Sequence, residues 1–192
     1  MIIKYEKAFD YFYKLIKEYH GDLPLIIAFD GRSTSGKTSL AERLKEVLNI
    51  PVIHIDDFYR PKNEYGELEI SEFDGNFDII RFKREVVEHL KKKNIFKYGV
   101  FDCKLGRIEK YNEIAAFECC IIEGAYSLNP KLNEYVDLKV FFDINEETQK
   151  QRILHRNGEK QLENFKNIWL PAEERYLEHY QIKKSCDIIV NS

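Results

Sequence analysis

One short stretch of the chain, FDGRSTSGKTSL, places two glycines, several hydroxyl residues and a lysine directly after the apolar run LPLIIAF. Within it, GRSTSGKT fits the pattern G-x-x-x-x-G-K-[ST] at every fixed position. Glycines let the backbone curl so that successive N–H groups point at phosphate oxygens, and the lysine and final hydroxyl add a charge and a Mg²⁺ ligand. The pattern predicts a loop that binds a nucleoside triphosphate. Its candidate ATP-binding residues are Gly31, Ser33, Thr34, Ser35, Gly36, Lys37, Thr38 and Ser39.

A second polar stretch, HIDDFYRP, follows the apolar residues 51–55 and carries the carboxylates Asp56 and Asp57. Active sites of open parallel α/β sheets lie at the carboxyl ends of strands. A carboxylate there can accept the proton of a hydroxyl that attacks a γ-phosphate. Seen alone, such a pair is more typical of a solvated turn or a helix cap. Beside a phosphate-binding loop we expect a catalytic role, with Tyr59 packing on a sugar or base.

Apolar runs alternate with helical patterns along the rest of the chain, and this order positions the two polar stretches. The alternation predicts an α/β fold, a five-stranded parallel sheet with helices on both faces. The turn-like KLGR inside residues 98–111 predicts a small β-hairpin insertion, within an excursion of about 94–116. Strands are expected at 23–29, 51–55, 119–124, 138–144 and 187–190, and helices at 2–20, 37–49, 78–93, 146–156 and 161–179.

Length and composition set limits on the class of protein. The 192 residues suit a single domain, 1–192, that opens with an N-terminal helix within 1–22. A formal net charge of −3 argues against a general nucleic-acid or membrane-surface binder. The four cysteines show no metal-ligand spacing, and the N-terminal stretch is too charged for a signal peptide or a membrane span. We therefore expect a cytoplasmic protein in a reducing compartment.

Four segments carry a family resemblance that extends from about Leu23 to Val190. FDGRSTSGKTSLAERL, HIDDFYRP, FDGNFD and IIEGAYSLNP resemble, in this order, the uridine kinase and phosphoribulokinase-like group of P-loop kinases. The resemblance implies a three-layer P-loop NTPase fold of the nucleoside/nucleotide-kinase type. It also implies ATP as the phosphoryl donor, Mg²⁺ as the metal and a small-molecule acceptor. The reaction would be transfer of the γ-phosphoryl group to a hydroxyl of a nucleoside, uridine- or cytidine-like, or of a related molecule.

The resemblance also implies catalytic and metal-binding roles. Asp56 matches the aspartate that acts as general base, and Lys37 grips the phosphates. Glu123, in IIEGAY, matches an acidic residue that helps hold Mg²⁺ together with Thr38. Asp57 stands at a more variable position, for which we expect contact with Mg²⁺ or its water.

Two arginines resemble the lid arginines of these kinases. Arg152 and Arg156, spaced i, i+4, share one helix face, and such arginines close over the phosphates in the transition state. The lid is short, about 152–162. An exposed basic helix face is the common alternative for such a pair.

The acceptor side departs from the family pattern. Asp74, in FDGNFD, would hold ribose hydroxyls, and Asp78 looks like the N-cap of the next helix. In the hairpin, Phe101 stands where the family has a tyrosine, Gly106 stands where it has a base-reading histidine, and Arg107 follows. Phe101 and Arg107 are therefore expected to line the acceptor wall, while the missing histidine leaves the acceptor open.

Two alternatives stay open from the sequence. One is a kinase of another small alcohol, such as nicotinamide riboside, pantothenate or a sugar phosphate. The other is a nucleotide-binding regulatory protein that does not transfer phosphate. A GTPase is disfavoured because no Asn-Lys-x-Asp segment occurs in the usual place. Neither nucleic acid nor a membrane is expected as a partner, and a homo-oligomer is compatible with the sequence.

Overall fold

The fold is known from a computed structural model that describes residues 1–132 and 135–192. Within this part of the chain the main sheet has six parallel strands in the order β1-β8-β7-β2-β6-β3. The predicted α/β class with a parallel sheet is confirmed, and the sheet has one strand more than predicted. The strands are β1 (Ile2–Lys4), β2 (Leu25–Gly31), β3 (Val52–His54), β6 (Cys119–Glu123), β7 (Leu138–Asp143) and β8 (Ile188–Asn191).

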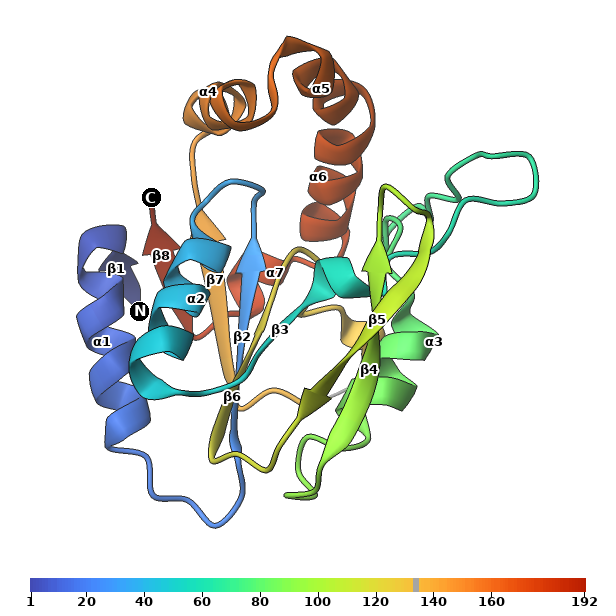
Figure 1. The fold of residues 1–192 in the computed structure, drawn as a ribbon. Coiled ribbons are helices and arrows are strands. Elements are labelled where there is room, and N and C mark those ends of the chain that lie inside the picture. The colour runs from blue at the N-terminus through green and yellow to red at the C-terminus, as the bar shows by residue number, and fades with distance from the viewer. Residues whose placement is uncertain (133–134) are drawn as a thin grey trace.

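Helices cover both faces of the sheet and its upper edge (Figure 1). α1 and α2 lie on one face, and α4, α5 and α6 stand above the carboxyl ends of the strands. In the described residues no helix combines the length and apolarity needed to cross a membrane. The α-helices are α1 (Tyr5–Lys17), α2 (Lys37–Leu48), α3 (Ile79–Phe82), α4 (Glu146–Asn157), α5 (Glu159–Asn164), α6 (Leu170–His179) and α7 (Ile182–Ser185).

Strand β2 lies in the middle of the sheet, and all seven of its residues are buried. Its side chains alternate between two cores, since successive strand residues point to opposite faces. Leu25, Ile27 and Phe29 join the core beneath α1 and α2, whereas Ile26 and Ala28 join the core on the other face. A strand buried on both faces reads as a continuous apolar run, which is why this one was predictable.

The N-terminal prediction was wrong at its start. Residues 2–4 form the edge strand β1, parallel to β8, and the helix begins only at Tyr5 and ends at Lys17. The amide of Ile189 donates to the carbonyl oxygen of Met1 at 2.8 Å, so the first residues supply partners to an otherwise open sheet edge. An apolar pair such as Ile2 and Ile3 fits a helix or a strand, and these residues form a strand because they pair with β8.

The predicted hairpin is confirmed as β4 (Phe96–Asp102) paired antiparallel with β5 (Arg107–Ile114). The buried guanidinium of Arg81 attaches it to the domain by donating to the carbonyl oxygens of Gly99 at 2.7 Å and Asp57 at 2.6 Å. The expected N-cap role of Asp78 is also confirmed, since its carboxylate accepts from the amide of Arg81 at 3.0 Å.

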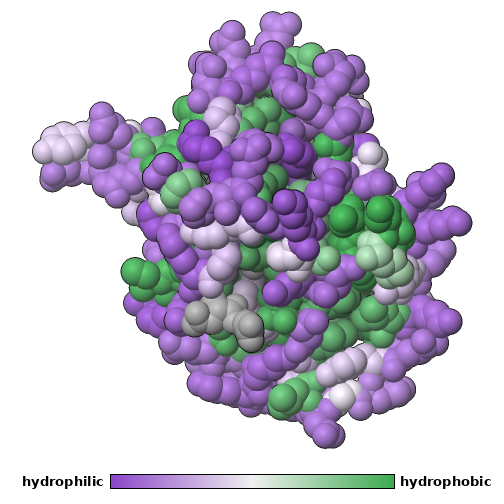
Figure 2. Space-filling model, turned by 180° about the vertical axis from the view of Figure 1, so that it is seen from behind, coloured by the Kyte–Doolittle hydropathy of each residue, from purple (hydrophilic) through white to green (hydrophobic). Residues whose placement is uncertain are grey.

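The predicted helix at 78–93 is shorter than expected. It is regular over α3, widens into the π-helical turn η2 (Lys83–Val87), and continues only as turns up to residue 93. The preceding segment, expected as loop over 56–77, begins with the 3₁₀ turn η1 (Ile55–Phe58). Its part around residues 61–72 projects from the body of the molecule (Figures 1 and 2).

A stability prediction follows from the end of β2. Gly31 has φ +124°, and a Cβ there would clash with the backbone carbonyl oxygen of Phe142. We expect Gly31→Ala to lower the free energy of unfolding by about 3 kcal/mol or more, because backbone cannot move aside as a side chain can. Thermal and urea unfolding measure the change.

Gly66→Ala is the matched control. Gly66 also has positive φ, +77°, but no atom lies within 4 Å of the position that a Cβ would take there. Gly66→Ala should therefore lower the free energy of unfolding by only about 1–2 kcal/mol, the cost of a left-handed backbone conformation in alanine. Equal losses at the two glycines would contradict the close approach at Gly31.

Candidate active site

The predicted phosphate-binding loop joins β2 to α2 at the upper edge of the sheet (Figure 1). Because α2 begins at Lys37, the amides of its first turn have no partner within the helix and point toward the loop. The Lys37 ammonium group is buried and donates to the carbonyl oxygens of Gly31 at 2.9 Å and Arg32 at 2.8 Å. The loop region thus brings main-chain N–H donors and the positively charged Lys37 side chain together.

Two observations fit a phosphate and a divalent metal at this loop. The hydroxyl oxygen of Ser35 is buried and has no hydrogen-bond partner among the described residues. The Thr38 hydroxyl donates to Glu123 at 3.0 Å, which brings a hydroxyl and a carboxylate together. Mg²⁺ is usually bound by one or two carboxylates together with substrate phosphates, rather than by a complete protein cage. Accordingly, no group of three or more His, Cys, Asp or Glu that could hold a metal occurs in the described chain.

His54 was not assigned a partner from the sequence, and the structure gives it two. Its Nδ1 lies 2.5 Å from Glu123, and its Nε2 lies 3.0 Å from Glu42 of α2. Burial alone would lower the pKa of His54, but the hydrogen bond and charge of Glu123, with further charges from Asp57 and Glu42, raise it above its usual value. The pairing β3–β6, with His54 opposite Glu123 in register, produces this contact.

Asp56 lies in the turn η1 directly after β3, and its carboxylate accepts from the Tyr59 hydroxyl at 2.7 Å. It reaches solvent, yet many protein atoms surround it, and this desolvation raises its pKa above the usual aspartate value. The charge of Glu123 raises that pKa further, whereas the Tyr59 hydrogen bond and the charge of Lys37 lower it. Asp56 therefore lies within electrostatic range of both predicted phosphate and metal ligands.

Three further predicted residues lie on the hairpin side of the site. Burial raises the pKa of Asp57 above the usual aspartate value, and the charge of His54 and then the Tyr98 hydroxyl of the hairpin act in the lowering direction. Phe101 is half-buried where the ladder shifts register, and Arg107 is exposed at the turn with its Nε 3.3 Å from Glu109. Their contacts with metal or acceptor stay predictions.

Asp74 is buried, and both of its oxygens already have partners. It accepts from Lys131 at 2.6 Å and Asn129 at 2.8 Å, and more weakly from Ser71 at 3.2 Å. Burial would raise its pKa, but these hydrogen bonds, led by that of Lys131, lower it below the usual value. The predicted contact with ribose hydroxyls stays a prediction, and the present geometry shows Asp74 joining its loop to the segment after β6 that carries Asn129 and Lys131.

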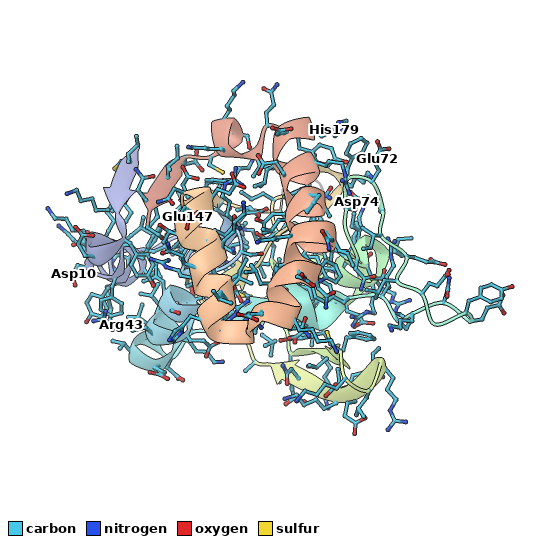
Figure 3. All side chains as sticks on the ribbon, turned by 90° about the horizontal axis from the view of Figure 1, so that it is seen from above. Asp10, Arg43, Glu72, Asp74, Glu147 and His179 are labelled. Atoms are coloured by element: carbon cyan, nitrogen blue, oxygen red, sulfur yellow. The ribbon has the colours of Figure 1, made fainter. Side chains whose placement is uncertain are left out.

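The segment around Asp74 is attached to α6. The Phe73 ring stacks on His179 with centroids 3.7 Å apart, and Arg175 donates to the Glu72 carbonyl oxygen at 3.3 Å. Figure 3 shows Glu72, Asp74 and His179 together at one end of α6.

The two arginines that were predicted to form the lid differ in their contacts. Arg152, on α4, donates to the carbonyl oxygen of Thr34 at 3.0 Å, so it lies against the phosphate-binding loop. Arg156, one turn later, is exposed and contacts its neighbour Asn157 at 2.8 Å. Its contact with the nucleotide stays a prediction that would require movement of the lid.

Sequence reasoning missed a second set of contacts to the loop, made by two adjacent carboxylates of α6. Glu174 forms a bidentate ion pair with Arg32, and this pair lines a cleft of about 940 Å³ between α4 and α6. Glu173 accepts from the amide and the hydroxyl of Ser33 at 2.8 and 2.6 Å. The run PAEERY carries both residues, but nothing in its spacing shows which loop they reach.

Comparisons with known proteins give the family of the chain and its fold. The Phosphoribulokinase / Uridine kinase family matches residues 26–190. The chain belongs to this family. A uridine kinase from Chlamydia pneumoniae is 26% identical over 189 residues, covering 88% of this chain and 82% of that protein. A uridine kinase from Ligilactobacillus salivarius is 25% identical, covering 87% and 84%.

Two solved structures share the fold of this family member. A protein described as a possible uridine kinase from Bacillus stearothermophilus superposes with a TM-score of 0.74 at 19% identity, over 96% of this chain and 98% of that one. D-glycerate 3-kinase from Cryptococcus neoformans gives a TM-score of 0.62 at 16% identity, over 96% and 95%. The predicted P-loop kinase fold is thereby confirmed. Family membership implies a phosphotransferase that acts on an alcohol group and uses ATP with a divalent metal.

A stability prediction tests the contacts of Asp74. Asp74→Asn places an amide NH₂ among the donors of Lys131, Asn129 and Ser71, and should lower the free energy of unfolding by about 1–3 kcal/mol at pH 7. Because the folded pKa of Asp74 lies below the ordinary value of 3.8, its contribution is present above that value and is lost as the pH falls through the folded pKa. Urea unfolding at pH 7 and at about pH 3 measures both effects.

Asp10→Asn, on the exposed outer face of α1, is the control and should change stability by less than about 0.5 kcal/mol. A loss at Asp74 that stays constant down to pH 3 would contradict the stabilising role of the ionised carboxylate.

Proposed function

We propose that this protein is a Mg²⁺-dependent kinase that transfers the γ-phosphoryl group of ATP to a hydroxyl of a nucleoside-like molecule. The observation that carries the proposal is the position of Asp56. Asp56 follows the end of β3 by two residues, and β3 pairs with β6 so that His54 stands opposite Glu123, which supports a proton acceptor near this predicted metal ligand. The charges of Glu123 and Lys37 also influence the pKa of Asp56, in opposite directions. A nucleotide-binding protein that transfers no phosphate has no need of a carboxylate at that place.

Each residue has a distinct task in the proposed reaction. The loop amides and Lys37 bind the triphosphate, and Thr38 and Glu123 would hold Mg²⁺, which when bound neutralises charge on the phosphates. Asp56 accepts the proton of the attacking hydroxyl. Arg152, already in contact with the loop at Thr34, is placed to offset charge that develops on the transferred group.

The acceptor side supports a molecule with a flat ring. Tyr59, which donates to Asp56, lies parallel to Trp169 of the turn η4 (Phe165–Trp169), with ring centroids 6.5 Å apart and planes inclined by 12°. The position of the family's base-reading histidine is Gly106, with φ +66° and open space around it. We infer that aromatic stacking, rather than a hairpin hydrogen bond, orients the acceptor, so uridine, cytidine and other ring-bearing alcohols such as nicotinamide riboside are the first candidates.

The first functional prediction concerns the proton acceptor. Asp56→Asn keeps the size of the side chain but removes its basicity, and we expect kcat to fall by a factor of about 10²–10⁴ with the affinity for Mg-ATP within about twofold of wild type. Coupled ADP-release assays with a panel of nucleosides, vitamins and sugars measure turnover, and calorimetry measures ATP affinity.

Asp102→Asn, a change of the same type on the hairpin, is the control and should retain turnover. Unchanged turnover in Asp56→Asn would contradict the proton-transfer role. ADP release by the wild type only with acceptors that lack a ring would exclude a nucleoside-like substrate, and no release with any acceptor would favour the regulatory alternative.

The second functional prediction concerns the aromatic pair. Trp169→Leu should raise the acceptor KM about two- to twelvefold, since an aromatic contact contributes about 0.5–1.5 kcal/mol, and should leave the ATP KM unchanged. Trp169→Phe, which keeps an aromatic ring, should restore most of the affinity. An acceptor KM that does not respond to either variant would assign Trp169 to packing alone.

A further inference from the structure

Glu173 is a buried carboxylate whose partners belong to the phosphate-binding loop. Its side chain comes from the middle of α6, and the residue is only 3% exposed. One oxygen accepts from both the main-chain N–H and the hydroxyl of Ser33, at 2.8 and 2.6 Å. The other oxygen accepts from the side-chain amide of Gln149 at 3.0 Å. The carboxylate therefore has three donors, and two of them come from one loop residue.

Gln149 extends this contact to α4. It is 1% exposed, and the same amide nitrogen that donates to Glu173 also donates to the carbonyl oxygen of Ser33 at 3.2 Å. Both polar groups of the Ser33 backbone are thus bound by side chains of two different helices. Arg152, one helical turn after Gln149, donates to the next loop carbonyl, that of Thr34. In Figure 3, α4 and α6 lie side by side above the strand ends, as these contacts require.

The loop residues that these contacts hold include one with an unfavourable backbone conformation. Thr34 has φ +60°, in the left-handed region that a β-branched residue rarely adopts. Such a conformation persists only where the surroundings hold it. The residue before it, Ser33, is bound by Glu173 and Gln149, and the carbonyl oxygen of Thr34 itself accepts from α4.

Burying the carboxylate of Glu173 is costly without hydrogen-bond partners. The hydroxyl of Tyr176, on the same helix, donates to Asp30 instead. Two of the three donors of Glu173 belong to Ser33, in a loop that must hold its shape to receive a triphosphate. A preformed loop binds more tightly because less ordering remains to be done on binding.

We propose that Glu173 is a positioning residue that holds Ser33, and with Gln149 keeps residues 33–38 preformed for the phosphates. The proposal rests on the proposed function only in that the loop binds ATP. It predicts an effect on nucleotide affinity and loop protection, separate from any effect on proton transfer at Asp56.

The test replaces the carboxylate by its isosteric amide. Glu173→Gln keeps the volume but leaves one acceptor oxygen where the carboxylate has two, so the side chain can no longer accept from both Ser33 and Gln149. We expect the Kd of the non-hydrolysable probe Mg-AMPPNP, measured by calorimetry, to rise about tenfold. Hydrogen–deuterium exchange in the ligand-free peptide spanning residues 30–38 should become faster by at least a similar factor. Where an acceptor supports turnover, the KM for ATP should rise while the acceptor KM is unchanged.

Glu178→Gln, an exposed glutamate on the same helix, is the matched control and should leave probe affinity and loop exchange as in the wild type. Should Glu173→Gln not fold, Ser33→Ala, which removes only the hydroxyl donor at 2.6 Å, gives the second measurement, with an expected rise in Kd of about threefold.

Two results overturn the proposal. One is unchanged probe affinity in a folded Glu173→Gln, or in Ser33→Ala where the first does not fold. The other is faster exchange spread over the whole chain with a lower Tm but no selective change at 30–38, which would show a structural role alone. Absence of phosphoryl transfer by the wild type would refute the proposed function and leave this proposal standing, because AMPPNP binding requires no transfer.

Discussion

The close approach of Gly31 to the backbone of Phe142 is the constraint on which the site depends. β2 runs between β6 and β7, and at its last residue there is no room for a side chain. The chain leaves the sheet at that point and reaches α2 through the loop 32–36. Thr38, in the first turn of α2, is thereby brought to Glu123 at the end of the neighbouring strand β6. The two predicted Mg²⁺ ligands meet because β6 ends at Glu123, opposite Phe29, while β2 continues two residues further to Gly31 before the chain turns toward α2.

The same edge of the sheet gathers several carboxylates, and their different surroundings give them different chemistry. Asp30 is fully buried and accepts from the amides of Gly31 and Leu128 and from the Tyr176 hydroxyl, yet burial still raises its pKa to about 6. Glu123 is bound by Thr38 and His54. Asp56 is the member of this set that reaches solvent with a single hydroxyl partner. An incoming hydroxyl can approach it without breaking a buried contact, which is why we propose the general-base role for Asp56 and not for Asp30.

The sequence predicted what is encoded locally and missed what is decided by distant packing. The loop, the buried strands and the hairpin each have a pattern of their own, and their places in the fold are as predicted. The loop pattern also names Lys37 and Thr38, whereas the roles of Asp56 and Glu123 rest largely on the family resemblance and stay proposals. Residues 2–4 were misassigned because their partner, β8, lies at the other end of the chain. No spacing in the sequence showed the contacts of His54 and Glu173, which arise from strand register and from the docking of α6.

The docking of α6 links the two sides of the proposed reaction. Within one short helix and its preceding turn, Trp169 lies against Tyr59, Glu173 binds Ser33, and His179 stacks on the loop that holds Asp74. These contacts come from different residues spaced along α6 and the turn before it. A substitution at one of them can therefore change one side of the site while the helix still holds the other side.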